Sequence, residues 1–217
     1  MKKVLITICF EYTIDKLHGS VEDINNVKNV SSFDTSILFT DIKKTTFSYD
    51  EVFYRCSIKS CIDEISKYDN IDSSIFLYIA GHGVVSGFLW HDMSIISIDD
   101  LFSSIFTSLL CIVDICNGPL LRLPYVYDQY KRIWKFGAGK SKDATQIFFV
   151  SSVTGIHSKM DALGSVYSRN LYSNFVTDKS IATNINNIYR SHPLSRIFCT
   201  NPCSESLQQL KDILICQ

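Results

Sequence analysis

Two residues with reactive side chains, His82 and Cys116, each follow the end of an apolar run. His82 lies between two glycines directly after the run 74–80, and Cys116 follows the run 109–115. A thiol becomes a nucleophile when a nearby base removes its proton, and an imidazole with a pKa of about 6.5 can act as that base. It can later return the proton to a leaving amine. Backbone amides, here those of Gly83 and Cys116, could stabilise the oxyanion of the tetrahedral intermediate.

The same pair of residues has a second interpretation. A buried histidine and an unreactive cysteine at two unrelated turns would give an identical pattern. The chemistry requires that the two runs be strands of one sheet, because the carboxyl ends of parallel strands share an edge where sites form. The order of the other elements therefore decides whether a Cys-His dyad is possible.

Apolar runs alternate with helical patterns along the chain, which is typical of an α/β fold with a largely parallel sheet. After Ser20, for example, Val21, Ile24 and Val27 recur at three-residue spacing, as on one face of a helix. We predict strands over 4–10, 36–40, 74–80, 110–114 and 146–153, helices over 20–31, 50–68, 98–110 and 165–175, an edge strand at 197–199 and a terminal helix over 205–214.

The composition favours one domain and excludes several classes of function. The 217 residues are 46% hydrophobic, which is enough for one core, and 21 basic against 22 acidic side chains leave a net charge of −1. A nucleic-acid-binding surface would need a basic excess, and the longest apolar runs, about ten residues, are half of a bilayer span. Glu11 interrupts the N-terminal apolar run and no signal-peptide cleavage site follows. We therefore expect a cytoplasmic protein that binds neither nucleic acid nor membrane.

Eight cysteines are many for this length, but their spacing fits neither a zinc site nor a disulfide framework. No two of them are separated by only two residues, and most lie in apolar runs, where cysteine acts as a small hydrophobe. We interpret all except Cys116 as packing residues in a reducing environment: Cys9, Cys56, Cys61, Cys111, Cys199, Cys203 and Cys216.

Five segments resemble motifs of the metacaspases, a family in the caspase clan of cysteine peptidases. The segments AGHG at 80–83 and DICNG at 114–118 are similar to the family's histidine and cysteine motifs. The others are LHGSVED at 17–23, IDDL at 98–101 and LPYVY at 123–127. The resemblance implies a caspase-like (caspase–hemoglobinase) fold, in which helices flank a mostly parallel central sheet on both faces.

The resemblance also implies a cysteine endopeptidase in which His82 is the general base and acid and Cys116 the nucleophile. The sequence is similar to small family members without a prodomain. A single domain would then consist of a part that carries the dyad (1–120), a basic linker loop (121–145) and a smaller part (146–217).

The specificity implied by the resemblance is for basic residues. The pocket for the substrate residue before the scissile bond is acidic in metacaspases, and Asp23 and Asp114 occupy the corresponding positions. Two carboxylates attract Arg or Lys and repel aspartate, so we expect cleavage of proteins or peptides after basic residues. Ser20 and Ala80 belong to the same implied pocket, Ala80 where the family usually has serine, and Leu17 replaces the arginine with which caspases bind aspartate. Asp23 could alternatively be only a first-turn helix acid.

Departures from the family motifs leave two other functions open. Beside Cys116, Ile115 replaces serine, Asn117 replaces histidine, and one residue of the motif is missing. A catalytically weak or inactive homologue that acts as a binding or decoy module would tolerate these changes, although the intact His82 and Cys116 argue against it. An aspartate-specific protease of the caspase type is the third possibility, which the acidic pocket opposes.

Many metacaspases bind calcium through an acidic pair and a further aspartate. The pair corresponds to Asp99 and Asp100, but Arg122 stands in place of the further aspartate. Calcium takes six to eight oxygen ligands, whereas arginine only donates hydrogen bonds. We expect Arg122 to pair with Asp99 or Asp100 and the activity to need no cofactor. A solvated arginine beside two helix-capping acids is the alternative.

The segment 121–145 lacks a regular apolar period, so we expect a loop there. Its basic residues are candidate points of self-cleavage by an enzyme with an acidic pocket, and a solvated basic loop is the other interpretation. No apolar stripe requires a second copy of the chain, and we expect a monomer. The candidate cleavage points are Arg132, Lys135, Lys140 and Lys142.

Overall fold

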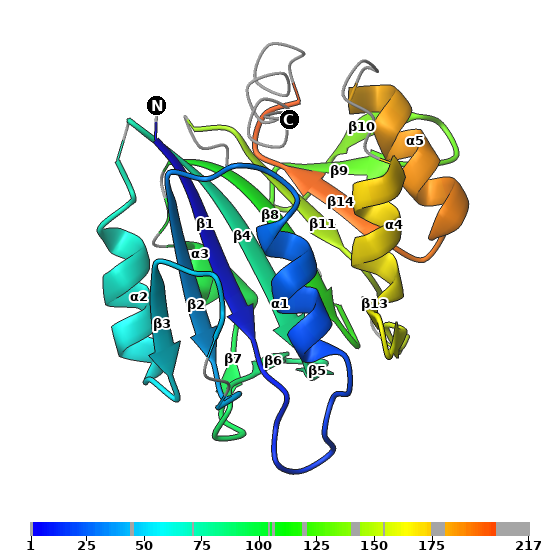
Figure 1. Ribbon diagram of the computed structural model, residues 1–217. Coiled ribbons are helices and arrows are strands. Elements are labelled where there is room, and N and C mark those ends of the chain that lie inside the picture. The colour runs from blue at the N-terminus through cyan, green and yellow to red at the C-terminus, as the bar shows by residue number, and fades with distance from the viewer. Residues whose placement is uncertain are drawn as a thin grey trace.

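A nine-stranded sheet forms the centre of the protein (Figure 1). The computed structural model describes residues 2–43, 46–70, 72–103, 105, 107–118, 121–139, 144–153, 155–174 and 181–202. The strands of the sheet are β1 (Lys2–Cys9), β2 (Thr35–Thr40), β3 (Glu51–Tyr54), β4 (Ser73–Gly81), β8 (Ser108–Ile115), β9 (Tyr125–Asp128), β10 (Ile133–Phe136), β11 (Gln146–Val150) and β14 (Arg196–Cys199). Their order across the sheet is β10-β9-β14-β11-β8-β4-β1-β2-β3.

Most of the sheet is parallel. Strands β3, β2, β1, β4, β8 and β11 pair in parallel, and β14, β9 and β10 add antiparallel pairs. The carboxyl ends of β1, β4, β8 and β11 therefore share one edge. Near this edge, at the lower end of Figure 1, lie two small sheets: β5 (Gly83–Val84), β6 (Gly87–Leu89) and β7 (Ile95–Ile96), and β12 (Met160–Asp161) with β13 (Gly164–Ser165).

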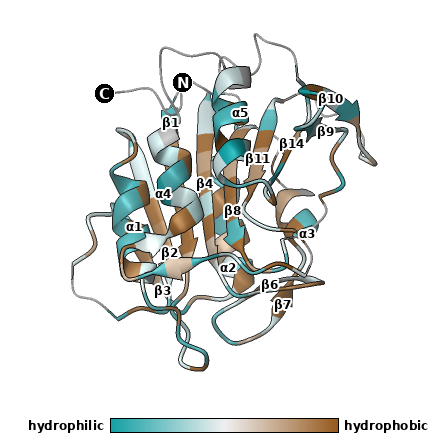
Figure 2. Cartoon of the chain, turned by 90° about the vertical axis from the view of Figure 1, so that its right-hand side faces the viewer, coloured by the Kyte–Doolittle hydropathy of each residue, from teal (hydrophilic) through white to brown (hydrophobic). Residues whose placement is uncertain are grey.

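Helices cover both faces of the sheet and enclose two apolar layers. Helices α1 (Ser20–Lys28), α4 (Val166–Asn174) and α5 (Ile181–Ser191) cover one face, and α2 (Ile58–Ser66) and α3 (Ile98–Ser103) cover the other. All nine residues of β4 are buried, as in a parallel strand that is covered on both faces. Figure 2 shows the apolar colour along the central strands and hydrophilic colour on the outer helices. The predicted α/β fold with a mostly parallel sheet between helices is confirmed.

Several element boundaries differ from the prediction. The helix predicted over 50–68 is the strand β3 followed by α2, which begins after Ser57, whose hydroxyl accepts the Ser60 N–H at 3.1 Å. Helix α3 ends at Ser103, whereas the predicted helix extends to residue 110. The strand predicted at the edge of the sheet, β14, lies inside the sheet between β9 and β11. Helix α5 is not predicted, and the terminal helix over 205–214 lies outside the described residues. Within the part of the chain described, no helix is both long and apolar enough to span a membrane.

The predicted loop over 121–145 is wrong for two segments, which form the β9–β10 hairpin. Tyr127 and Trp134 pair across the hairpin, and their ring centroids are 5.2 Å apart. Tyr127 also stacks on Tyr189 of α5 at 5.8 Å. Aromatic side chains thus give the hairpin one apolar side that packs beneath α5, so the strands form without a regular apolar alternation.

Candidate active site

His82 and Cys116 follow the ends of two adjacent parallel strands, β4 and β8. The register pairs Gly81 with Ile115, so the next residue along the two strands is His82 in one and Cys116 in the other. The backbone of Gly83 packs so closely here that a Cβ atom would overlap the carbonyl oxygen of Cys116. The structure therefore brings the two predicted residues together at the carboxyl edge of the sheet.

The His82 imidazole is held by the loop after β1. Its Nε2 lies 2.5 Å from the Asp15 carbonyl oxygen. Because a carbonyl only accepts hydrogen bonds, Nε2 carries the proton and Nδ1 is the basic nitrogen. The Tyr12 ring packs on the imidazole with 4.6 Å between centroids, and its hydroxyl accepts the His82 backbone N–H at 3.1 Å and donates to the Leu89 carbonyl at 2.6 Å. Neither Tyr12 nor Asp15 belongs to the sequence motifs. The sequence signal for Tyr12 is an aromatic side chain just past a buried strand.

Asp41, directly after β2, fixes the shape of this loop. Its two carboxylate oxygens accept the backbone N–H groups of Glu11 and Tyr12, at 2.7 and 2.9 Å. Tyr12 and Asp15 have left-handed backbone conformations, with φ of +62° and +52°, which cost about 1–2 kcal/mol each for residues other than glycine. The bonds to Asp41 offset this strain and hold the Asp15 carbonyl against the imidazole.

The loop that follows Cys116 is tied to two other loops through Asn117. The Asn117 backbone N–H donates to the Ile156 carbonyl at 2.8 Å. Its side-chain Nδ2 donates to the Gly83 carbonyl at 3.2 Å, and its Oδ1 accepts the Gly155 N–H at 3.0 Å. Asn117 thereby links the loops after β4, β8 and β11.

Three other cysteines are more deeply buried than Cys116. Burial raises the pKa of the Cys9, Cys61 and Cys111 thiols well above its ordinary value, so these groups stay protonated at neutral pH. They lie in the apolar layers. Cys116, by contrast, is half-buried at a strand end.

Asp23 and Asp114, which form the predicted acidic pocket, both accept hydrogen bonds from Ser165. Asp23 in the first turn of α1 is 2% exposed, and Asp114 near the end of β8 is 4% exposed. The Ser165 N–H donates to Asp23 Oδ1 at 2.7 Å, and the Ser165 hydroxyl donates to Asp114. The hydroxyls of Ser158 and Ser168 also donate to Asp114, at 2.6 and 2.5 Å. The two acids are thus together, and both are buried and hydrogen-bonded to the protein's own groups.

The electrostatics of the pocket centre on Asp23. Burial raises its pKa to about 7, and the charge of Asp114 adds to the effect. The Ser165 amide, the Tyr78 hydroxyl and the charge of Arg169 lower the pKa of Asp23 by less. The Oδ2 atom of Asp23 is buried and makes no hydrogen bond within the described residues. When ionised, Asp23 is therefore a buried acceptor whose Oδ2 has the Tyr78 hydroxyl nearby but no hydrogen bond of good geometry among the described residues.

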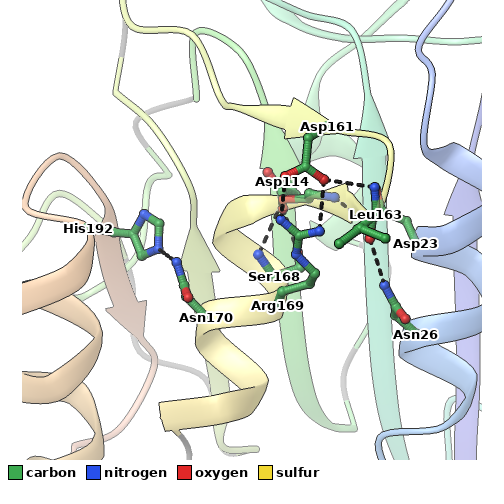
Figure 3. Close-up of polar contacts among 10 residues, drawn as sticks. Asp23, Asn26, Asp114, Asp161, Leu163, Ser168, Arg169, Asn170 and His192 are labelled. Carbon is green, nitrogen blue, oxygen red and sulfur yellow. Dashed lines mark hydrogen bonds and ion pairs between the residues drawn. The ribbon is translucent and has the colours of Figure 1, made fainter.

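The β12–β13 hairpin covers this pocket. Arg169 of α4 donates two hydrogen bonds to Asp161, at 2.8 and 2.7 Å, and Asn26 Nδ2 donates to the Leu163 carbonyl at 3.2 Å (Figure 3). Gly164 has a φ of +95°, and a Cβ atom there would overlap the Asp23 carboxylate in α1. The hairpin is therefore anchored on both α1 and α4.

Ser20 and Ala80, the other residues predicted to line the pocket, are buried in the core. The Ser20 hydroxyl donates to the carbonyls of Phe10 and Leu17, at 3.2 and 3.0 Å. Ala80 is fully buried in the apolar layer beneath α1. Both side chains stabilise strand ends and neither is open to a ligand in this structure.

The expected pairing of Arg122 with an acid takes a different form. The Arg122 backbone N–H donates to Asp99 Oδ1 at 3.3 Å, and the Asp100 N–H donates to the Ser97 hydroxyl at 3.3 Å at the start of α3. Among the described residues, no group of three His, Cys, Asp or Glu side chains could hold a metal ion. Asp99 and Asp100 supply two carboxylates, whereas calcium takes six to eight oxygen ligands and arginine supplies none.

The candidate self-cleavage points occupy different environments. Arg132 is exposed in the turn of the β9–β10 hairpin, with a φ of +56°. Lys135 lies in β10 and forms an ion pair with Asp128. Lys140 and Lys142 lie outside the described residues.

Comparison with known proteins supports the fold. The structure is similar to that of caspase-1 from Spodoptera frugiperda, with a TM-score of 0.59 and 14% sequence identity, over 87% of this chain and 76% of that chain. A scan of protein-family models and a search of curated proteins each found no match. The chain therefore has a caspase-like fold, with His82 and Cys116 at the ends of adjacent parallel strands.

Proposed function

We propose that this chain is a cysteine endopeptidase in which Cys116 is the nucleophile and His82 the general base. One observation carries the proposal: the register of β4 and β8 places both residues at adjacent strand ends. The caspase-like fold supports it. Because one fold hosts several activities, the proposal rests on the dyad and not on the fold.

In the proposed reaction, Nδ1 of His82 takes the proton of the Cys116 thiol while Nε2–H stays bonded to the Asp15 carbonyl. The thiolate attacks the scissile carbonyl carbon, and the N–H groups of Gly83 and Cys116 stabilise the oxyanion. The imidazolium protonates the leaving amine nitrogen as the C–N bond breaks, which leaves a thioester on Cys116. Water, deprotonated by Nδ1, hydrolyses the thioester and restores the thiol.

The proposed substrates carry Arg or Lys before the scissile bond. A guanidinium or ammonium group would supply the donor that Asp23 Oδ2 lacks and would balance the charge of Asp114. An aspartate there would add a negative charge beside Asp114, which opposes the aspartate-specific alternative. Because both acids are buried, entry of a basic side chain requires that the β12–β13 hairpin move.

We further propose that this activity needs no calcium. The Asp99 carboxylate accepts the Arg122 backbone N–H, and Arg122 stands in the sequence where calcium-binding metacaspases have a further aspartate. No step of the proposed reaction uses a metal.

Fluorogenic peptides that end in Arg, Lys or Asp before the reporter group test the proposal, with Cys116→Ala as the control protein. We expect the wild type to hydrolyse the basic peptides at least about tenfold faster than the Asp peptide, since charge-assisted pairing contributes more than about 1.4 kcal/mol. The rate should be the same with calcium or with a chelator. Equal rates for wild type and Cys116→Ala, or a preference for Asp, would show that the proposal is wrong.

A non-catalytic binding module is the second candidate, and the burial of the two acids favours it. Asp23 and Asp114 are buried and Asp114 is already bonded to three serine hydroxyls. Such a module would not hydrolyse an Arg peptide. Its Cys116 would also fail to react with a thiol-reactive ketone attached to an Arg peptide, which distinguishes it from the peptidase.

A further inference from the structure

We infer that Asn117 is a positioning residue that fixes Cys116 relative to the His82 loop. The inference rests on the proposed peptidase function and deepens it. Asn117 directly follows the nucleophile and is half-buried. Its role would be to set the distance and direction between the thiol and the imidazole, without touching the substrate.

Three hydrogen bonds make Asn117 a link between three loops. The side-chain donor Nδ2 binds the Gly83 carbonyl, in the loop that also carries His82. The side-chain acceptor Oδ1 binds the Gly155 N–H, and the backbone N–H binds the Ile156 carbonyl, both in the loop after β11. A side chain with one donor and one acceptor end is required to bind two loops in this way.

The backbone of Asn117 also directs the peptide group of the nucleophile. In a trans peptide the N–H and the preceding C=O point in opposite directions. Because the Asn117 N–H points to Ile156, the Cys116 carbonyl points to the other side, where it packs on Gly83. The φ of +52° that this needs is one that asparagine tolerates better than most residues.

Other bonds hold the same loop independently of the Asn117 side chain. The Gly118 N–H donates to the Ser152 hydroxyl at 3.0 Å, and this hydroxyl donates to the Ile115 carbonyl at 2.7 Å. Variants at position 117 are therefore expected to fold, because the loops after β8 and β11 stay joined. What they lose is the connection to the His82 loop.

Two substitutions separate the contributions of backbone and side chain. Asn117→Gly keeps the left-handed backbone but removes both side-chain bonds. Asn117→Asp keeps the acceptor for Gly155 and replaces the donor to Gly83 with an oxygen that only accepts. Met93→Gly is the matched control, because Met93 is an exposed non-glycine residue with a φ of +68° in the turn between β6 and β7.

The experiment measures kcat and KM with an Arg peptide, the rate at which iodoacetamide alkylates Cys116 at pH 7, and the melting temperature. We expect both Asn117 variants to lower kcat about ten- to hundredfold, because a small misplacement of reacting groups has effects of this size, with KM nearly unchanged. Alkylation of Cys116, located by mass spectrometry, should slow about tenfold because the thiol is no longer held beside the base that activates it. Met93→Gly should match the wild type in kcat, KM and alkylation rate.

The outcomes separate this inference from the proposed function. Wild-type kcat and alkylation rates in both Asn117 variants would overturn the inference while the peptidase stands. A higher KM with unchanged kcat would also overturn it, since Asn117 would then act in substrate binding. If the wild type hydrolyses no peptide, the proposed function fails, and the alkylation rates alone decide whether Asn117 positions Cys116. Should Asn117→Gly not fold, Asn117→Asp gives the same readouts.

Discussion

Replacing Asp23 with asparagine should stabilise the protein at alkaline pH. The amide oxygen of the introduced side chain can still accept the Ser165 N–H that Asp23 Oδ1 accepts at 2.7 Å, and it carries no charge. Burial raises the pKa of Asp23 from 3.8 to about 7, so ionising Asp23 in the folded protein is unfavourable. One pKa unit equals about 1.4 kcal/mol, and the rise corresponds to about 4 kcal/mol.

The sign of this effect follows from proton binding. Between pH 4 and pH 7 the folded protein holds the Asp23 proton and the unfolded chain does not, so the free energy of unfolding decreases as the pH rises. Above pH 7 both states are ionised and the loss is complete. Asp23→Asn removes this dependence. The free energy of unfolding of the variant, relative to that of the wild type, should therefore rise by about 3 kcal/mol between pH 5 and pH 8.

Urea unfolding of both proteins at several pH values from 5 to 8 measures this difference. Asp128→Asn is the control, because Lys135 lowers the pKa of Asp128 to about 2 and the group is ionised throughout this range in both states. Its effect should not vary with pH. A difference between Asp23→Asn and wild type that is constant from pH 5 to pH 8, or a variant less stable at pH 8, would refute the reasoning. The same variant should hydrolyse Arg peptides at least about tenfold more slowly.

Three further predictions concern the elements around the site. Gly164→Ala should lower the free energy of unfolding by at least about 2 kcal/mol, because its Cβ would overlap the buried Asp23 carboxylate. Gly155 has a φ of +84° and open space around it, so Gly155→Ala should lower the free energy of unfolding by only about 1 kcal/mol in the same urea titration. Tyr12→Phe should reduce kcat more than it changes KM, because it removes the hydroxyl that holds the His82 backbone. An unchanged kcat would contradict this role. On prolonged incubation, mass spectrometry should find self-cleavage after Arg132, in an exposed turn, and not after Lys135, which is held in a strand.

A strand whose residues are all buried is easy to predict from sequence. The run 74–80 could be recognised because β4 is covered on both faces and therefore reads as continuous apolar sequence. β3 was predicted as helix because Val52 fits a helical spacing with residues of α2, while its pairing with β2 depends on a distant segment. The β9–β10 hairpin depends in the same way on packing against α5, which no local pattern encodes.

The site could be predicted as far as its side chains carry the chemistry. His82, Cys116, Asp23 and Asp114 lie in recognisable motifs at strand and helix ends. The Asp15 carbonyl could not be predicted, because every residue has one and only the left-handed turns of this loop direct it to the imidazole. The serine hydroxyls on Asp114 come from segments after β11, and serine is too common there to mark a partner.

The position of the β9–β10 hairpin has a consequence for how copies of the protein meet. It pairs with the side of β14 that faces away from β11, so this side of the strand is covered by the chain itself and is closed to a neighbour. The strands left at the two ends of the sheet, β3 and β10, have four residues each and carry Glu51 and Lys135. Short, charged end strands resist intermolecular strand pairing. Pairing of sheets between copies would therefore have to use one of these two short end strands.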